Sequence, residues 1–178
     1  MKDVKIRRAE GKDAYEITKL RHRSWLSAYV KESMATKEEI DKQFNQQLED
    51  KCRMLELEKY FDSDIHNCFV AESDNQLMGI VWLNDKNQEK EPMLETCRMW
   101  GLYIEPKFQQ QHIGTKLWYF ASDYAKKIGY KKLELDTPVQ NQNAIVFYEN
   151  KGGVKVKVYK DELVLGREID FVEYEFQL

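Results

Sequence analysis

The sequence has few of the features that mark secreted, membrane-bound or disulfide-rich proteins. Its three cysteines are odd in number, lie far apart and include no Cys-x-x-Cys pair, so no disulfide framework is expected. No apolar stretch is long enough for a signal peptide or a bilayer span. We therefore expect buried thiols in a reducing compartment, which means a cytoplasmic protein with no membrane partner.

Neither positive nor negative charge predominates in the sequence. Lys and Arg total 28 against 31 for Asp and Glu, the formal net charge is −3, and no long basic run occurs. This balance argues against an obligate nucleic-acid partner. A mildly acidic surface would tolerate a cationic acceptor such as an amine.

Repeats, low-complexity tracts and Pro/Gly/Ser-rich linkers are absent as well. A chain of 178 residues is near the usual size of one domain, and 42% hydrophobic residues suffice for a buried core. We therefore expect residues 1–178 to form a single globular domain.

The hydrophobic pattern alternates between strand and helix signals. Apolar positions from Ile113 onward recur at three- and four-residue steps and stop at Gly129, which predicts the strongest helix. Thr36 opens a capping-box pattern, and Asp74-Asn75 predicts a hairpin turn. The order of these strand and helix signals along the chain indicates an α/β domain with a mixed sheet. Strands are expected at residues 4–8, 68–71, 77–83, 93–104, 133–135, 154–158 and 171–176, helices after Asp13, Thr36, Ile113 and Asn143, and a polar loop at 84–91.

The junction before the strongest helix is a candidate anion site. The strand Trp100–Ile104 leads through Gln109 into the start of that helix. A helix N-terminus presents free backbone N–H groups and a partial positive charge, so it can hold a pyrophosphate. Gly114 would let the backbone come close to such an anion.

This junction resembles the pyrophosphate loop of the GNAT superfamily of N-acetyltransferases. The family pattern is Gln/Arg-x-x-Gly-x-Gly/Ala, with Gln109 in its first position and Gly114 in its last. The preceding Leu102-Tyr103-Ile104-x-Pro106 matches the family's strand. His112 stands where the family usually has its first glycine. Either its imidazole assists phosphate binding, or its ring points away and the substitution is tolerated.

A second segment is similar to the same family. Asn141 to Gly152 matches the pattern Asn-x-x-Ala-x-x-Phe-Tyr-x-x-x-Gly at every named position and at the expected distance downstream. Gly153 replaces the usual aromatic residue, which predicts a hole in the packing of that strand. The resemblance implies the GNAT fold, a central mixed, mostly antiparallel sheet of about seven strands flanked by about four helices.

The resemblance also implies an activity, the direct transfer of an acetyl group from acetyl-CoA to a primary amine without a covalent enzyme intermediate. The acceptor class is a polyamine, a small amine, an amino acid or a protein amine. Tyr148 would protonate the departing thiolate, and Asn141 would bind the pantetheine or a water molecule. A homodimer through the closing strands is a further expectation by analogy. The implied cosubstrate-binding residues are Leu102, Tyr103, Ile104, Gln109, Gln110, Gln111, His112, Ile113, Gly114, Thr115, Asn141 and Tyr148.

The base that takes a proton from the acceptor is less easily assigned. Some family members use a carboxylate on the strand before the loop, but Arg98 stands at that position here. Glu95 is the nearest alternative and is our candidate catalytic residue beside Tyr148. The three histidines lack metal-ligand spacing, so no metal is expected. Aromatic residues that could line the amine pocket, or simply pack in the core, are Trp25, Tyr29, Trp82 and Trp100.

Two interpretations remain open. The helix containing Trp25 and Tyr29 and the strand containing Glu95 and Arg98 are loosely similar to PaiA-type polyamine acetyltransferases. The alternative is a non-catalytic acyl-CoA-binding sensor or partner-docking module that keeps the fold. Retention of Tyr148 favours catalysis, because a pure binder has no need of an acid for the thiolate.

Overall fold

A computed structural model describes residues 3–84, 95–164 and 166–178. The described residues form one seven-stranded sheet in the order β1-β2-β3-β4-β5-β7-β6, with five α-helices. Only β4 and β5 pair in parallel, so the predicted mixed, mostly antiparallel sheet is confirmed. The elements are β1 (Lys5–Arg8), α1 (Ala14–Trp25), a π-helical turn (Leu26–Val30), α2 (Lys37–Glu49), α3 (Lys51–Asp62), β2 (Asn67–Ser73), β3 (Gln76–Leu83), β4 (Thr96–Ile104), α4 (Ile113–Lys127), β5 (Lys132–Pro138), α5 (Gln142–Glu149), β6 (Val154–Val164) and β7 (Arg167–Gln177).

The early helices begin and end at polar residues. Thr36 and Glu39 form the predicted capping box, in which the Thr36 hydroxyl accepts from the Glu39 N–H and the Glu39 carboxylate accepts from the Thr36 N–H. Asp50 ends α2 and caps α3 by accepting from the Arg53 N–H. This break turns the expected second helix into two, which explains why five helices are found where about four were predicted.

The helix predicted after Asp13 is α1, and Asp13 stands at its N-cap position. Its side chain makes no capping hydrogen bond to α1, and it instead accepts from the Arg7 guanidinium and the Glu10 N–H. Asp13 therefore marks the start of α1 by position, while its side chain serves a capping box with Glu10 one turn earlier.

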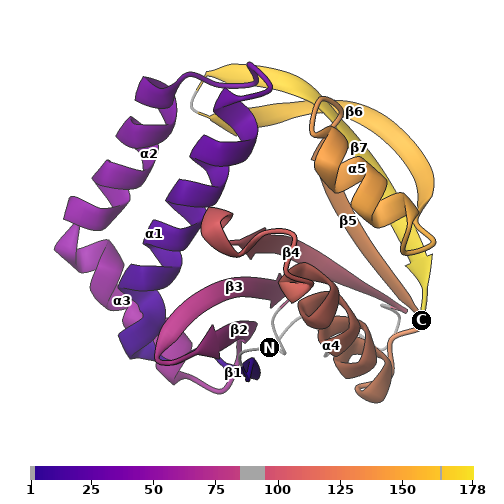
Figure 1. Ribbon diagram of the computed structural model, residues 1–178, viewed down its shortest axis with the longest axis horizontal. Helices are drawn as coiled ribbons and strands as arrows, with labels where there is room; N and C mark the ends of the chain where they lie inside the picture. The colour runs from indigo at the N-terminus through magenta and orange to yellow at the C-terminus, as the bar shows by residue number, and fades with distance from the viewer. Residues whose placement is uncertain (1–2, 85–94, 165) are drawn as a thin grey trace.

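The β2–β3 hairpin follows the sequence closely. Asp74 and Asn75 both have positive φ, 50° and 58°, as a two-residue turn matching the strand twist requires. Successive β2 side chains then alternate between the faces of the sheet. Cys68 packs with α1 and α3, whereas Phe69 packs with α4, so the two cores lie on opposite faces (Figure 1).

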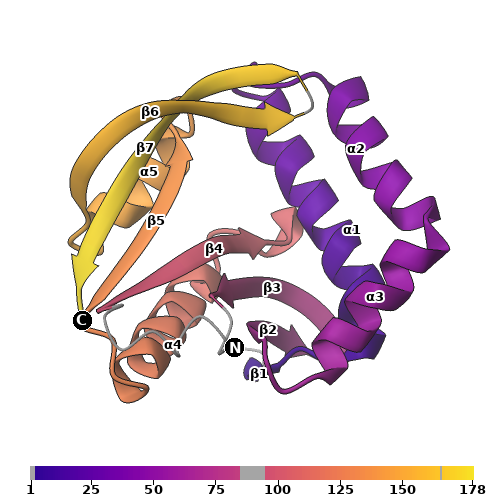
Figure 2. The ribbon, with the colours of Figure 1, turned by 180° about the vertical axis from the view of Figure 1, so that it is seen from behind.

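A bulge in β4 opens the centre of the sheet. Leu83 pairs with Met99 and Trp82 with Gly101, so Trp100 is the extra residue. Met99 faces α4, and the bulge reverses the alternation so that Tyr103 faces the α1 side. The β4–β5 ladder contains only three pairs and ends at Arg98. Beyond it the two strands diverge, as Figures 1 and 2 show from opposite sides.

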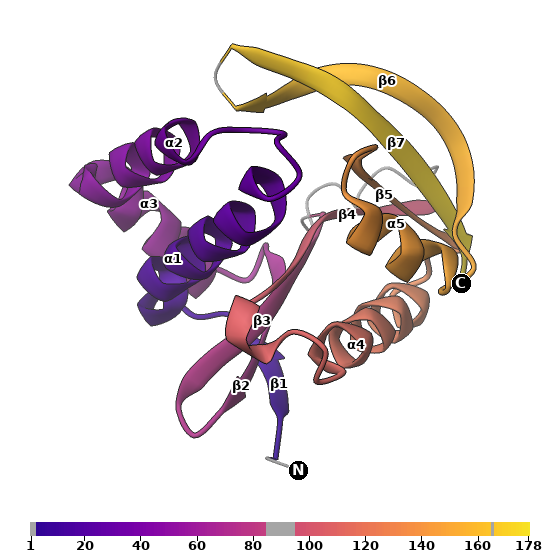
Figure 3. The same cartoon turned by 45° about the horizontal axis from the view of Figure 1, so that its top comes forward.

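The closing hairpin reaches back over the early helices. Figure 3 shows β6 and β7 arching toward α2. Leu163 and Val164 pack with Ile40 and Phe44 of α2, and the Arg167 guanidinium lies 3.0 Å from the Glu39 carboxylate. The far end of the opening is thus closed by contacts between the first and last parts of the chain.

Two details differ from the predictions, and a third lies mostly outside the described residues. Gly153 leaves no hole, because a Cβ there would lie 2.7 Å from the Phe176 ring. Cys68 and Cys97 are buried as expected, but Cys52 is exposed on α3. Most of the predicted loop at 84–91 and the strand start at Met93 fall within residues 85–94, which are not described.

Across the described ranges, no helix combines the length and apolar character needed to cross a bilayer.

Candidate active site

The divergence of β4 and β5 creates a cavity of about 190 Å³. Its walls come from both halves of the sheet, from α1 and the turn that follows it, and from α5. Predicted site residues that line it are Trp25, Tyr29, Trp100, Leu102, Tyr103, Asn141 and Tyr148. Residues far apart in the sequence therefore meet at the point where the sheet loses its ladder.

Tyr148 contributes a buried hydroxyl to this cavity. The side chain projects from α5 and packs among the aromatic rings of Trp118, Phe147 and Phe176. Burial raises the pKa of the Tyr148 hydroxyl, so the group stays protonated well into alkaline solution. Its oxygen has no hydrogen-bond partner among the described residues. A protonated donor is thus held ready for a ligand.

Two buried tyrosines are expected to make the free energy of unfolding fall at alkaline pH. Burial raises the pKa of Tyr29 as well as that of Tyr148. Both contributions are fully present below about pH 10 and decrease above it, because the unfolded tyrosines then ionise while the buried ones cannot. We expect Tyr148→Phe to lose less stability than the wild type between about pH 8 and about pH 11, as measured by urea unfolding. Equal losses in both proteins would contradict this linkage.

Asn141 lies beside Tyr148 at the start of α5. Its side-chain oxygen accepts from the Ala144 N–H at 3.3 Å and so caps the helix. The carboxamide N–H₂ group remains for a ligand in the cavity. The residue therefore has a structural role, and its contact to the pantetheine or water stays a prediction.

The start of α4 has the backbone of an anion-binding turn. Gln110 and His112 have φ values of 59° and 61°, and His112 is the N-cap residue. The first N–H groups of α4, from Ile113 onward, have no partner within the helix, and its first turn contains no acidic residue. A Cβ added at Gly114 would find its nearest neighbour at 3.6 Å, so the protein itself does not crowd this position.

The His112 backbone explains how this residue can replace a glycine. It adopts the left-handed conformation that glycine tolerates at no cost, while its side chain is exposed. We expect His112→Gly to raise the free energy of unfolding by about 1 kcal/mol, since the strain removed exceeds the added flexibility of the unfolded chain. His112→Ala keeps the Cβ and should gain nothing. An equal gain for alanine would show that the imidazole, not the backbone, is destabilising.

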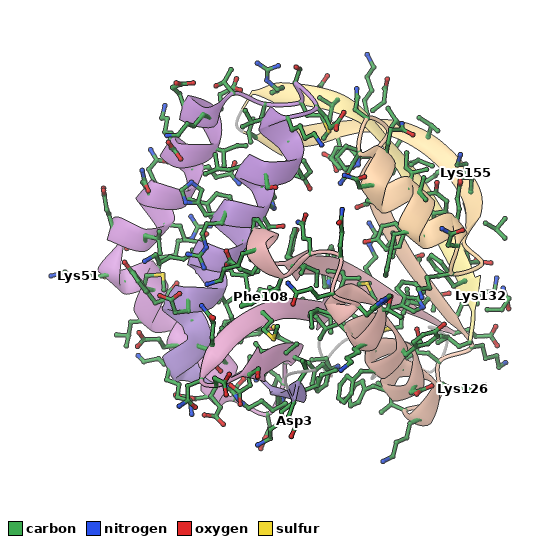
Figure 4. The ribbon with its side chains drawn as sticks, viewed as in Figure 1. Asp3, Lys51, Phe108, Lys126, Lys132 and Lys155 are labelled. Carbon is green, nitrogen blue, oxygen red and sulfur yellow. The ribbon has the colours of Figure 1, made fainter. Side chains whose placement is uncertain are left out.

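One side of the cavity is acidic. Asp136 on β5 lines it and contacts the Arg98 guanidinium and the Tyr159 hydroxyl, and Glu162 lies at its edge. None of the described residues that line the cavity is a lysine or arginine. Lys132 and Lys155, at the right edge of the molecule in Figure 4, do not line the cavity and are paired with Glu175 and Glu149.

Three other parts of the predicted site lie outside this cavity. Trp82 packs with Tyr60 and Phe61 on the α1 and α3 side of the sheet. Glu95 is exposed and pairs with Lys131, roughly 16 Å from Trp100 along an extended strand. The remaining predicted residues lie at the end of β4, in the turn before α4 and in the first turn of α4, rather than in the cavity wall. They are Ile104, Gln109, Gln110, Gln111, His112, Ile113, Gly114 and Thr115.

Sequence reasoning missed Asp136 and the role of Arg98. A signal was present, because Asp136 is a polar residue near the carboxyl end of a parallel strand, where ligands often bind. Arg98 contacts Asp136, Glu134 and Glu173, so three carboxylates share one guanidinium. Among the described residues no group of His, Cys, Asp and Glu could hold a metal ion.

The opened sheet, the free N–H groups at the start of α4 and the cavity lined by Tyr148 are the candidate functional features of this α/β fold. This chain belongs to the acetyltransferase (GNAT) family, whose sequence profile matches residues 23–153. An uncharacterized N-acetyltransferase of Methanocaldococcus jannaschii is 33% identical over 106 residues, which cover 57% of this chain and 45% of the relative. The chain spans about half the length of the curated relatives it matches.

Solved structures share the fold at low sequence identity. The PaiA N-acetyltransferase of Thermoplasma acidophilum in complex with coenzyme A superimposes with a TM-score of 0.75 at 20% identity, covering 99% of both chains. A chimeric spermidine N-acetyltransferase from Vibrio cholerae has a TM-score of 0.66 at 20% identity, covering 98% of this chain and 95% of the other. Both likenesses concern the fold, and they agree with the family assignment.

Proposed function

We propose that this protein is an N-acetyltransferase that transfers the acetyl group of acetyl-CoA directly to a primary amine. The observation that carries the proposal is the Tyr148 hydroxyl, which lines the cavity between β4 and β5, stays protonated through burial and has no hydrogen-bond partner in the described part of the chain. Membership of the acetyltransferase (GNAT) family supports it, and so does the coenzyme A bound by the PaiA structure.

Two parts of the fold suit such a cosubstrate. The free N–H groups at the start of α4 suit the pyrophosphate, and the uncrowded backbone at Gly114 leaves room for it. The pantetheine arm suits the gap beside Leu102, because the β4 backbone facing β5 loses its ladder partner beyond Arg98. A backbone N–H there can polarise the thioester carbonyl and contribute several kcal/mol to transition-state stabilisation.

Charge in the cavity supports an amine as the acceptor. Asp136 and Glu162 are the charged side chains among the described lining residues, which favours an ammonium group over a carboxylate as the ligand. The spermidine acetyltransferase in the comparison shows that this fold accepts a polycation in another protein. We propose a polyamine, small amine, amino acid or protein amine as the acceptor, and the cytoplasm as the compartment.

The experiment is thiol release from acetyl-CoA by the full chain with a panel of polyamines, amino acids and peptides. We expect acceptor-dependent release, with the acetylated amine identified by mass spectrometry. Binding of acetyl-CoA without turnover on any amine would contradict the proposal and support the sensor interpretation.

The homodimer stays a prediction. Val154, Val156 and Val158 are exposed on the edge strand β6, which is the closing strand that this prediction concerns.

A further inference from the structure

The two carboxylate oxygens of Asp136 have different surroundings. The Arg98 guanidinium and the Tyr159 hydroxyl both donate to Oδ2. Oδ1 has no hydrogen-bond partner among the described residues, and the side chain is 27% exposed in the wall of the cavity. A carboxylate held firmly through one oxygen thus offers the other to whatever enters.

Asp136 also shares the cavity with Tyr148, the residue proposed to protonate the departing thiolate. It lines the same cavity as Tyr148, and its charge is near enough to raise the pKa values of Tyr148 and Tyr29, after the larger effect of burial. An acceptor nitrogen in this cavity would therefore have both side chains in the surrounding wall. Arg98 stands at the β4 position where some family members carry a carboxylate, and its cationic guanidinium, bonded to Asp136, cannot serve as a base.

We infer that Asp136 is the carboxylate that faces the attacking nitrogen, a role that rests on the proposed acetyl transfer. Oδ1 accepts an N–H bond from the neutral acceptor amine and orients its lone pair. As the C–N bond forms, the nitrogen becomes positively charged, and the carboxylate stabilises that charge. Arg98 and Tyr159 are positioning residues, because they act on the substrate only through Asp136.

The proton balance follows directly. The acceptor ammonium loses its first proton to water before it attacks. The positively charged nitrogen of the tetrahedral intermediate then passes its second proton to Oδ1. The C–S bond breaks, and the thiolate takes the proton of Tyr148. The Asp136 proton leaves to solvent, and the tyrosinate regains a proton from water.

Other ionisable groups near the cavity are less suited to this role. Glu162 is exposed at its edge, and Tyr29 has its pKa raised by burial, so its phenolate is not available near neutral pH. The charged and titratable groups that face Asp136 or its immediate partners, from each strand and helix packed there, are Arg98, Glu134, Glu173, Tyr159, Lys157, Tyr29 and Tyr148.

The test compares Asp136→Asn, Asp136→Ala and Glu134→Gln with the wild type, using the acceptor that gives the fastest thiol release. We expect Asp136→Asn to lower kcat by about 30- to 100-fold with acetyl-CoA affinity unchanged, since asparagine accepts a hydrogen bond but takes no proton. Added formate should restore turnover of Asp136→Ala at least about tenfold by replacing the carboxylate. Glu134→Gln removes another partner of Arg98 outside the cavity wall and should stay within about twofold.

Melting temperatures of the variants establish that they fold. A kcat of Asp136→Asn within about threefold of the wild type, or no response of folded Asp136→Ala to formate, would overturn the inference while the wild-type turnover still upholds acetyl transfer. Absence of wild-type turnover on every amine would instead overturn the proposed function and this role together.

Discussion

Replacing Tyr148 by phenylalanine is expected to lower kcat by roughly a thousandfold, about 4 kcal/mol of transition-state stabilisation. The ring stays in its aromatic cluster, so the acetyl-CoA affinity should change little. The loss arises because the thiolate then leaves without a proton donor. Stopped-flow or steady-state thiol release, with acetyl-CoA binding measured by calorimetry, separates the two effects.

Tyr174 provides the matched control for this substitution. It is a fully buried tyrosine whose ring lies 6.2 Å from that of Tyr148, and it does not line the cavity. Tyr174→Phe removes a hydroxyl from the same cluster and should keep kcat within about twofold. Equal turnover in Tyr148→Phe and wild type would remove Tyr148 from the mechanism.

The second large effect concerns stability at Gly153. A Cβ at this position would lie 2.7 Å from Phe176 Cε1 and 2.9 Å from the Tyr148 carbonyl oxygen, which also accepts the Gly153 N–H at 3.0 Å. We expect Gly153→Ala to lower the free energy of unfolding by about 1–3 kcal/mol, and Gly153→Phe by more, in urea titrations. The backbone oxygen cannot move without displacing the end of α5.

A double-mutant cycle identifies the cause. If the Phe176 ring contributes to the clash, Phe176→Leu should cost less stability in the Gly153→Ala protein than in the wild type. Gly166→Ala is a useful comparison, because its φ is 81° but no atom lies within 4 Å of an added Cβ. An additive cycle would mean that the neighbouring ring is not responsible.

Local features of the fold were predictable because their causes lie within a few residues. The Thr36 capping box, the Asp74-Asn75 turn and the Gly129 stop after α4 all depend on short-range hydrogen bonds or on a positive φ. The Tyr148 position was predictable from its motif, and the structure places it in the cavity. Its catalytic role and the single-domain organisation remain predictions.

Features set by strand pairing were not predictable. Straight alternation along β4 places Tyr103 on the same face as Met99, but the bulge at Trp100 puts them on opposite faces. The contact between Arg98 and Asp136 depends on the parallel register of β4 and β5, which no local pattern encodes. The Gly153 prediction was wrong for the same reason, because Phe176 reaches that space from β7.

The two ends of the β4–β5 opening differ in mechanical strength. At one end three consecutive backbone pairs form a stiff corner. At the other, the Arg167–Glu39 ion pair is solvent-accessible and contributes little to stability, beside the small apolar cluster of Leu163 and Val164. Any widening that lets a ligand in or out is therefore concentrated at the hairpin end.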